Sequence, residues 1–286
     1  MERFTFKKGL GQNFLENRQI SRDIAAAAEA GPNDFVLEIG PGAGAITFPL
    51  AETAGHLASV ELDPRLVQSL RDQFAANPKV KIIFDDIMLT DLDELLEHEH
   101  AENFENIKII GNIPYNITSP IITKLLESGI KYERIVLMIQ REVAERISSP
   151  PGKRAYGYMS VFVQYYTEPE YLFKVGRENF MPCPSVDSAV VRLRRREKPP
   201  VSCEPALFFD TVKQCFSQKR KTLANNLAAR GGMDKKAAAA MLSGIGIDPS
   251  RRAETLSLEE FDKIALAVGA SNKNIKQEEK GPLSKW

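Results

Sequence analysis

Short apolar runs alternate with longer stretches of mixed polarity through the first half of the chain. Five of these runs predict buried strands at residues 35–39, 57–62, 80–84, 107–110 and 134–139. The neighbouring stretches predict helices, and Asn17 and the Asp63-Pro64 pair provide typical helix starts, at residues 17–31, 46–54, 63–76, 91–100, 119–128 and 141–147. Alternating strands and helices predict βαβ units and a mostly parallel sheet with helices on both faces.

The second half of the chain has a different pattern. A polar loop at residues 148–157 precedes an apolar helix at 156–166 and two alternating strands at 171–175 and 187–193. Pro199-Pro200 marks a domain boundary, after which helices are predicted at residues 205–229, 234–243 and 257–269. The predicted organisation is an α/β domain at residues 1–198 with an N-terminal arm at 1–16, a helical domain at 199–270 and a polar, disordered tail at 271–286.

Chemically distinctive residues close the successive predicted strands. They are the Gly40–Gly44 loop, Glu61, Asp86 and Asn112. In open α/β sheets, ligands bind outside the carboxyl ends of the strands. Glycines let a ligand approach the backbone closely, and a carboxylate 21 positions after Gly40 can accept from both hydroxyls of a ribose. Asp86 can accept from an adenine amino group, so the set predicts a site for a nucleoside-containing cofactor.

The spacing of the glycines narrows the choice of cofactor. The loop has the form Gly-x-Gly-x-Gly, whereas dinucleotide-binding loops have the form Gly-x-Gly-x-x-Gly. The Gly-Lys-Ser/Thr ending of a phosphate-binding loop is also missing from it. The sequence therefore favours S-adenosylmethionine over a dinucleotide, and a methyltransferase over an NAD-dependent oxidoreductase.

The stretch Asn112-Ile113-Pro114-Tyr115 follows the fourth predicted strand and suits the binding of a planar amine. The Asn112 amide oxygen and the Pro114 carbonyl are two candidate acceptors for an exocyclic amino group, while the Tyr115 ring offers a stacking face. Such contacts would leave the nitrogen lone pair free to attack a methyl group. A simple turn after a strand is the alternative. Phe180, in a proline-rich loop, is either a core residue or a second stacking face.

Composition indicates the cellular compartment. Lysine plus arginine equal aspartate plus glutamate at 38 each, and 43% of residues are hydrophobic, as in ordinary globular proteins. Three scattered cysteines favour a reducing compartment. A signal peptide is not visible, and no apolar run reaches the roughly 20 residues that span a bilayer. His56, His98 and His100 have no metal-ligand spacing, so the expectation is a cytoplasmic protein without a metal or a membrane partner.

Positive charge is concentrated in one part of this neutral chain. Residues 192–236 contain twelve lysines and arginines against four acidic residues. The cluster Lys219-Arg220-Lys221 precedes Asn225 and Asn226 on what is predicted to be one helix, and Lys153 and Arg154 lie in the loop at 148–157. Such clusters suit contacts with nucleic-acid phosphates, although a solvated surface is the alternative.

These motifs, in this order, resemble the KsgA/RsmA (Dim) family of small-subunit rRNA adenine dimethyltransferases. The resemblance covers about residues 3–270. The matching stretches are Lys8–Leu15, Glu38–Gly44, Glu61–Asp63, Asp86, Gly111–Ile117, Phe180–Ser188 and Arg251–Leu256. Ile113 is a conservative departure, since leucine is commoner there. The resemblance implies a seven-stranded, Rossmann-like, class I methyltransferase sheet with its last strand antiparallel, and a small helical C-terminal domain.

The resemblance also implies roles for particular residues. Asn13 and Leu15 would close over S-adenosylmethionine, Gly40 would lie against its methionine part, and Asn112 would stand between cofactor and substrate. Glu61 would hold the ribose and Asp86 the adenine. The N-terminal arm itself has two interpretations, a frayed terminus or a segment that Phe14 and Leu15 anchor so that Gln12 and Asn13 face a ligand.

The expected reaction is transfer of two methyl groups to N6 of each of two adjacent adenines in a hairpin loop near the 3′ end of small-subunit rRNA. The implied partner is the 30S or pre-30S particle, and the protein is expected to be a monomer. Two alternatives remain open at this point: methylation of large-subunit rRNA that confers macrolide resistance, and a non-catalytic role as a nucleic-acid-binding assembly factor.

Overall fold

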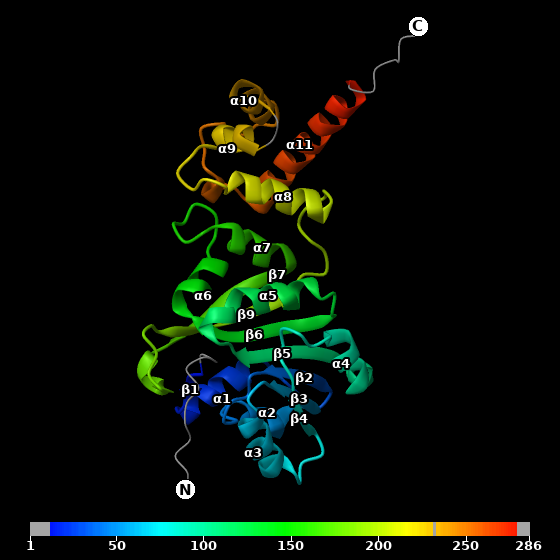
Figure 1. Ribbon diagram of the computed structural model, residues 1–286, viewed down its shortest axis with the longest axis vertical. Coiled ribbons are helices and arrows are strands. Elements are labelled where there is room, and N and C mark those ends of the chain that lie inside the picture. The colour runs from blue at the N-terminus through cyan, green and yellow to red at the C-terminus, as the bar shows by residue number, and fades with distance from the viewer. Residues whose placement is uncertain (1–11, 231–232, 279–286) are drawn as a thin grey trace. The chain divides into compact units, whose positions relative to one another are not determined.

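The computed structural model of this protein describes residues 12–230 and 233–278. Its chain divides into two compact units (Figure 1). The sheet unit comprises Met1–Glu145 and Thr167–Arg195, and the helical unit comprises Arg146–Tyr166 and Arg196–Trp286. The chain therefore leaves the sheet unit after residue 145 and returns to it at residue 167.

One seven-stranded sheet forms the centre of the sheet unit. Its strands follow the order β4 (Val80–Phe84), β3 (His56–Glu61), β2 (Asp34–Ile39), β5 (Asn106–Asn112), β6 (Tyr132–Gln140), β9 (Ser188–Arg195) and β7 (Thr167–Val175). The pairs from β4 to β6 are parallel. Strand β9, the last in the sequence, is antiparallel to both β6 and β7. The expected mostly parallel sheet with an antiparallel last strand is confirmed.

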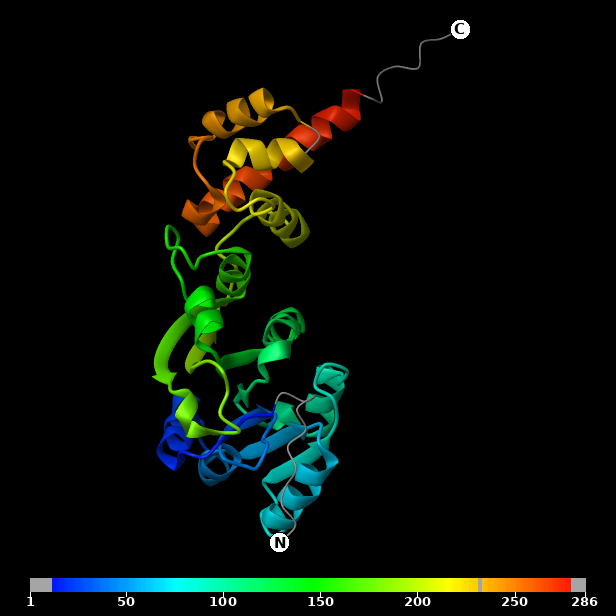
Figure 2. The ribbon, with the colours of Figure 1, turned by 60° about the vertical axis from the view of Figure 1, so that its left-hand side comes forward.

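Apolar residues in the central strands are buried on both faces of this sheet. Phe35, Val36 and Leu37 of β2 are fully buried, as parallel strands covered by helices require. The helices of this unit are α1 (Arg18–Ala27), α2 (Thr47–Thr53), α3 (Pro64–Phe74), α4 (Leu92–His98), α5 (Thr118–Glu127) and most of α6 (Arg141–Ile147), whose last two residues belong to the helical unit. Ile24 of α1 and Leu50 of α2 share one core cluster with Val36. Helices α4 and α5 lie on the other face of the sheet (Figure 2).

The predicted helix starts are present. The Asn17 side chain accepts from the backbone N–H groups of Gln19 and Ile20, and the Asp63 side chain accepts from the N–H of Arg65. These bonds satisfy donors that the first turn of a helix leaves free.

The helical unit has its own core. Its helices are α7 (Tyr158–Tyr166), α8 (Pro205–Cys215), α9 (Leu223–Arg230), α10 (Lys235–Gly244) and α11 (Leu258–Glu278). Val161 and Tyr165 of α7 are buried in one cluster with Phe208 of α8 and Phe261 of α11. Residues 146–166 therefore group with the C-terminal helices, and the division differs from the predicted boundary after residue 198.

Two helices of this unit end at other residues than predicted. The helix predicted at residues 205–229 is interrupted after Cys215, and Lys219–Lys221 lie in the connection to α9. Buried Asn226 donates to the backbone carbonyls of Cys215, at 2.6 Å, and Gln218, at 3.2 Å, and so satisfies groups that an uninterrupted helix would have paired internally. At the C-terminus, α11 continues to Glu278. The predicted tail thus includes helical residues, and 279–286 lie outside the described residues.

A second sheet of two short strands was not predicted. Strand β1 (Phe14–Leu15) pairs antiparallel with β8 (Phe180–Met181), with Phe14 opposite Met181 and Leu15 opposite Phe180. This pairing joins the N-terminal segment to the proline-rich loop, because Leu15 and Phe180 are opposite each other although 165 positions separate them in the sequence. Residues 1–11 of the predicted arm lie outside the described residues.

Candidate active site

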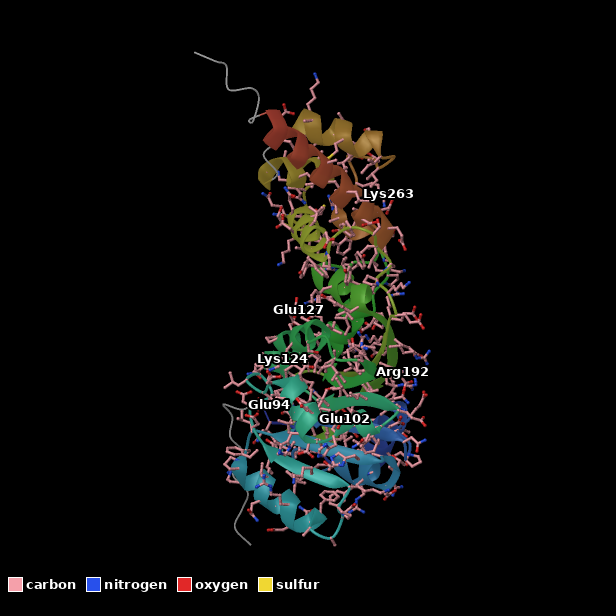
Figure 3. The ribbon with its side chains drawn as sticks, turned by 90° about the vertical axis from the view of Figure 1, so that its right-hand side faces the viewer. Glu94, Glu102, Lys124, Glu127, Arg192 and Lys263 are labelled. Atoms are coloured by element: carbon pink, nitrogen blue, oxygen red, sulfur yellow. The ribbon has the colours of Figure 1, made fainter. Side chains whose placement is uncertain are left out.

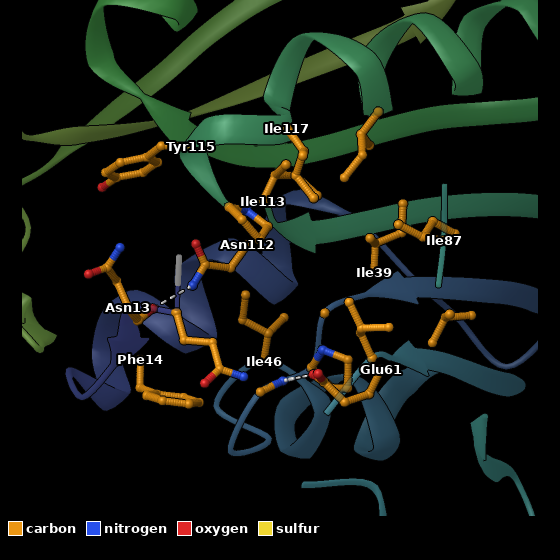
Figure 4. A pocket seen from close by; sticks show the side chains of 18 of the residues that line it. Asn13, Phe14, Ile39, Ile46, Glu61, Ile87, Asn112, Ile113, Tyr115 and Ile117 are labelled. Atoms are coloured by element: carbon orange, nitrogen blue, oxygen red, sulfur yellow. Dashed lines mark hydrogen bonds between the residues drawn. The ribbon is translucent and has the colours of Figure 1, made fainter. Parts of the chain in front are cut away.

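A cavity of about 280 Å³ lies at the carboxyl ends of the parallel strands. Its lining includes all the residues predicted to bind the cofactor or to act on the substrate amine: Asn13, Leu15, Gly40, Glu61, Asp86, Asn112, Pro114 and Tyr115. Figure 4 shows several of these side chains around the cavity. Parallel strands bring Gly40, Glu61, Asp86 and Asn112 to one edge of the sheet, and the N-terminal segment adds Asn13 and Leu15.

The glycine loop forms one wall of the cavity. Gly40 and Gly42 both have left-handed backbone conformations, with φ of 67° and 59°, which side chains rarely adopt. A side chain at Gly42 would also meet the Phe14 ring, because an added Cβ would lie 3.2 Å from its atoms. Glycine at this position therefore allows both the turn and the close packing of Phe14 against it.

Glu61, at the end of β3, is held in a fixed orientation. One of its carboxylate oxygens accepts from the N–H of Gly42 at 3.0 Å, and the other accepts from the N–H of Asp63 at 2.8 Å. Burial raises the pKa of this carboxyl above its usual value, and these two N–H groups oppose that rise. Each oxygen keeps a further lone pair, so the group can accept from two hydroxyls of a ligand.

Asp86 lies in the loop after β4. Its side chain accepts from the N–H of Met88 at 2.8 Å. Lys124 of α5 fixes the same loop, since its ammonium group donates to the carbonyls of Met88, at 3.0 Å, and Thr90, at 2.5 Å. Figure 3 labels Lys124 on its helix. These bonds hold the Asp86 carboxylate at the cavity wall, and the role of Lys124 was not apparent from the sequence.

Asn112 connects the end of β5 to the N-terminal segment. Its side-chain nitrogen donates to the backbone carbonyl of Asn13 at 3.2 Å, the bond drawn in Figure 4. Because only the nitrogen of an amide can donate, this bond also fixes the position of the amide oxygen. That oxygen accepts no hydrogen bond from the part of the chain that the structure describes. Asn112 thus lines the cavity with an available acceptor.

The expectation that the Pro114 carbonyl is free to accept was wrong. This oxygen already accepts from the N–H of Ile117 and from the hydroxyl of Thr118, both at 3.2 Å. The chain turns into a short 3-10 helix (Tyr115–Ile117) directly after Pro114, and that turn uses the carbonyl. The neighbouring residue Ile113 also lines the cavity, and the described residues donate no hydrogen bond to its carbonyl.

Tyr115 is anchored by its hydroxyl group. That oxygen lies 2.7 Å from the hydroxyl of Ser188, a fully buried residue at the start of β9. Burial raises the pKa of Tyr115, so the phenol stays neutral near neutral pH. The contact holds the ring at the cavity, where Figure 4 shows it. Ser188 ends the Phe180–Ser188 stretch that resembles the family, but it was not a predicted site residue, because the sequence does not show that its hydroxyl meets Tyr115.

Phe180 is a core residue, which was the alternative to its predicted role as a stacking face for the substrate base. Only 2% of its surface is exposed, and it belongs to the same buried cluster as Leu15 and Val190. It is not part of the cavity lining described above. Its pairing with Leu15 in the two-stranded sheet explains the burial, because that pairing directs its ring into the unit.

The helical unit brings its two predicted basic segments to one corner, Pro249–Leu256. The N–H of Gly152, beside Lys153 and Arg154, donates to the carbonyl of Glu254 at 2.7 Å. The N–H of Leu223, just after the Lys219–Lys221 connection, donates to the carbonyl of Arg251 at 2.8 Å. All five predicted RNA-binding side chains are exposed. Within the described residues they form no ion pairs.

The order of the seven strands, the glycine loop and the acidic strand ends together define a class I methyltransferase. Solved structures support this assignment. A 23S rRNA methyltransferase, ErmE, aligns with a TM-score of 0.70 at 29% identity, over 90% of this chain and 100% of its own. A dimethyladenosine transferase from Plasmodium falciparum aligns with a TM-score of 0.75 at 25% identity, over 91% of this chain and 98% of its own.

The chain belongs to the ribosomal RNA adenine dimethylase family, whose model matches residues 3–268. It is similar to ribosomal RNA small subunit methyltransferase A of Geobacillus thermodenitrificans, with 43% identity over 93% of this chain and 92% of that protein. The corresponding protein of Geobacillus kaustophilus is 41% identical over the same shares. The protein is thus an rRNA adenine dimethyltransferase, and its family and fold imply S-adenosylmethionine as the methyl donor. None of the described helices is long and apolar enough to cross a membrane.

Proposed function

We propose that this enzyme transfers two methyl groups to N6 of each of two adjacent adenines in a hairpin loop near the 3′ end of small-subunit rRNA. The observation that carries this proposal is the hydrogen bond from Asn112 to the Asn13 carbonyl, which leaves the Asn112 amide oxygen available at the cavity. An acceptor at this place, beside a fixed aromatic ring, suits the amino group of a flat base.

The cavity fits S-adenosylmethionine. The Glu61 carboxylate retains a lone pair on each oxygen for the two ribose hydroxyls, and Asp86 provides an acceptor for the adenine amino group. The Gln12 amide oxygen is a further acceptor, because it is buried and the residues that the structure describes offer it no hydrogen-bond partner. Asn13 and Leu15 would cover the bound cofactor, with Gly40 against its methionine part. The bound cofactor supplies a methyl group that its sulfonium already activates.

The residues around Asn112 would prepare the amine for attack. The lone pair of an adenine amino group is delocalised into the ring, so two acceptors on its hydrogens would favour a pyramidal nitrogen. Asn112 supplies one acceptor. The Ile113 carbonyl is the better candidate for the second, because the Pro114 carbonyl already accepts two bonds. Catalysis would then consist mainly of positioning, and the proton can leave after the attack.

The target base would leave its stack and lie on Tyr115, as bases do in other base-modifying enzymes. Stacking on one aromatic ring is worth about 1–3 kcal/mol and would offset part of the cost of unstacking. The bond to Ser188 fixes the Tyr115 ring before the base arrives. Phe180, in its buried position, would support the N-terminal segment in place of contacting the base.

Small-subunit rRNA is favoured over large-subunit rRNA as the substrate. Relatives named for the small subunit are 41–43% identical to this chain, whereas the 23S rRNA methyltransferase is 29% identical. We propose that a 30S or pre-30S particle presents the hairpin to a monomeric enzyme in the cytoplasm. The exposed residues of the helical unit would bind its phosphates: Lys153, Arg154, Lys219, Arg220 and Lys221.

The proposal is tested by the substitution Asn112→Ala. We expect it to abolish methyl transfer from radiolabelled S-adenosylmethionine to small subunits that lack the modification, because it removes the acceptor next to the target amine. Binding of the cofactor, measured by calorimetry, should weaken far less. Asn33→Ala is a matched control, since Asn33 directly precedes β2 at the opposite edge of the sheet.

Full activity of the Asn112→Ala protein would refute the assignment of the site. Mapping N6,N6-dimethyladenine in small-subunit rRNA, with and without the enzyme, tests the substrate separately. Two modified adjacent adenines that depend on the enzyme would support the proposal, and a modified base in large-subunit rRNA would contradict it.

A further inference from the structure

A polar groove of about 480 Å³ lies beside the candidate active site, entirely within the sheet unit. Three segments line it: the end of β6 with the start of α6, the turn after β7, and the loop before β9. The lining residues are Gln140, Arg141, Glu142, Arg177, Ser185, Val186 and Asp187. Ser185, Val186 and Asp187 belong to the Phe180–Ser188 stretch that resembles the family, but no function was predicted for any of the seven residues.

The groove is connected to the ring that is proposed to carry the target base. Asp187 lines the groove, and Ser188, the next residue, makes the 2.7 Å contact with the Tyr115 hydroxyl. A lining residue of the groove and the residue that supports the Tyr115 ring are therefore consecutive in the chain. A nucleotide next to a base on Tyr115 would pass close to this groove, because neighbouring nucleotides are joined by a single phosphate.

The carboxylates that line the groove already interact with other groups of the protein. Asp187 pairs with the ammonium group of Lys174 at 2.8 Å and accepts from the N–H of Arg177 at 3.2 Å. The Lys174 contact lowers the pKa of Asp187, so this carboxylate is ionised and paired at neutral pH. Arg141 lies 3.8 Å from Asp187 and 3.3 Å from Glu145. Glu142, the other carboxylate of the lining, also interacts within the protein.

Arg177 is the cation of the groove that remains available. Its side chain is exposed, and its guanidinium makes one long hydrogen bond, at 3.4 Å, to the Ser185 carbonyl. It forms no ion pair with the described residues. A guanidinium group presents several N–H donors in a planar arrangement that matches the oxygens of a phosphate. Val186, 42% exposed, adds an apolar contact at the same place.

We propose that this groove binds the backbone phosphate next to the target adenine, with Arg177 as its direct contact. The inference rests on the proposed position of that adenine on Tyr115. A phosphate held here would fix the strand on one side of the flipped base. The same contact could form when either of the two adjacent adenines lies on Tyr115, because a phosphate is the same whichever base is attached.

The test compares Arg177→Gln with the wild-type enzyme on small subunits that lack the modification. We expect the KM for the subunits to rise about three- to tenfold, because one phosphate contact is lost. The affinity for S-adenosylmethionine, measured by calorimetry, should not change. The slope of log(kcat/KM) against log of the KCl concentration should become shallower by about 0.7–0.9, the value for one phosphate contact.

Two variants control for the loss of charge. Arg177→Lys keeps the charge and should retain the salt slope. Lys131→Gln removes an exposed positive charge directly before β6, at the edge of the sheet opposite the groove, and should leave both quantities unchanged. A wild-type KM and salt slope in Arg177→Gln would overturn the proposal, as would an equal effect in Lys131→Gln. Asn112→Ala is assayed on the same particles. An error in the proposed phosphate contact can therefore be distinguished from an error in the proposed active site.

Discussion

A buried glutamate two residues before the glycine loop makes the stability of the sheet unit depend on pH. Glu38 is 1% exposed and sits within β2. The hydroxyl of Thr47 donates to its carboxylate at 2.8 Å and that of Ser59 at 2.7 Å. Burial raises the pKa of this carboxyl from 4.5 to about 7, although the two hydroxyls oppose the rise, and the nearby charge of Glu61 adds to it.

The sign and the size of the effect follow from this shift. Between pH 4.5 and about pH 7 the folded state holds a proton on Glu38 that the unfolded state has lost, so the free energy of unfolding falls as the pH rises. The loss is complete above the folded-state pKa. A shift from 4.5 to about 7 corresponds to about 3 kcal/mol, at roughly 1.4 kcal/mol per pKa unit. Glutamine does not titrate, and its amide can donate to the hydroxyls of Thr47 and Ser59.

We therefore expect Glu38→Gln to be more stable than the wild-type protein at pH 8, and to gain little or nothing at pH 5. The free energy of unfolding of the sheet unit is measured at both values by urea denaturation, followed through hydrogen exchange of amides in β2 and β5. The difference between the proteins should grow by about 2.5 kcal/mol from pH 5 to pH 8, because part of the effect is already present at pH 5. Glu52→Gln, at an exposed position of α2, is the control. A difference that is constant or shrinks with pH would refute the reasoning.

Two further substitutions test the packing around the site. Gly111→Ala would bring a Cβ within 2.8 Å of the Ile39 carbonyl, so we expect a loss of about 1–3 kcal/mol in stability and weaker binding of S-adenosylmethionine by calorimetry. Gly157→Ala, whose Cβ meets no atom within 4 Å, should change neither quantity. Lys108→Met removes the buried partner of Asp34, at 2.7 Å, and should destabilise the sheet unit by about 3–5 kcal/mol in urea denaturation. Wild-type stability in that variant would show that Asp34 finds another partner or protonates at little cost.

The convergence of the site residues could be predicted from the sequence. The apolar runs identify strands, and parallel strands place their carboxyl ends at one edge of the sheet. Gly40, Glu61, Asp86 and Asn112 each follow such a run, so their meeting at one cavity needs no knowledge of side-chain packing. The spacing of the glycines already favoured S-adenosylmethionine, and the resemblance to a family added the rRNA substrate and the dimethylation reaction.

Features that depend on side-chain contacts across the fold, or on the exact geometry of a turn, could not be predicted. The sequence near Lys219 does not show that the Asn226 side chain donates to the backbone carbonyls of Cys215 and Gln218, where α8 has ended. The basic cluster was therefore expected on a continuous helix. The carbonyl of Pro114 is used by a local turn whose geometry the residue types do not determine. Phe180 is buried because it pairs with Leu15, which lies 165 positions earlier in the chain.

The path of the chain between the two units has a consequence for biosynthesis. All seven strands of the large sheet have been made once residue 195 has left the ribosome. Helix α7 has been made by then too, but Phe208 and Phe261, which share its core, come later in the chain. A nascent chain of about 200 residues thus carries a finished sheet and an apolar helix exposed to water. A protein truncated near residue 198 would keep α7 without the helices that pack against it. The sheet unit therefore cannot be isolated from the helical unit by truncation at a single position.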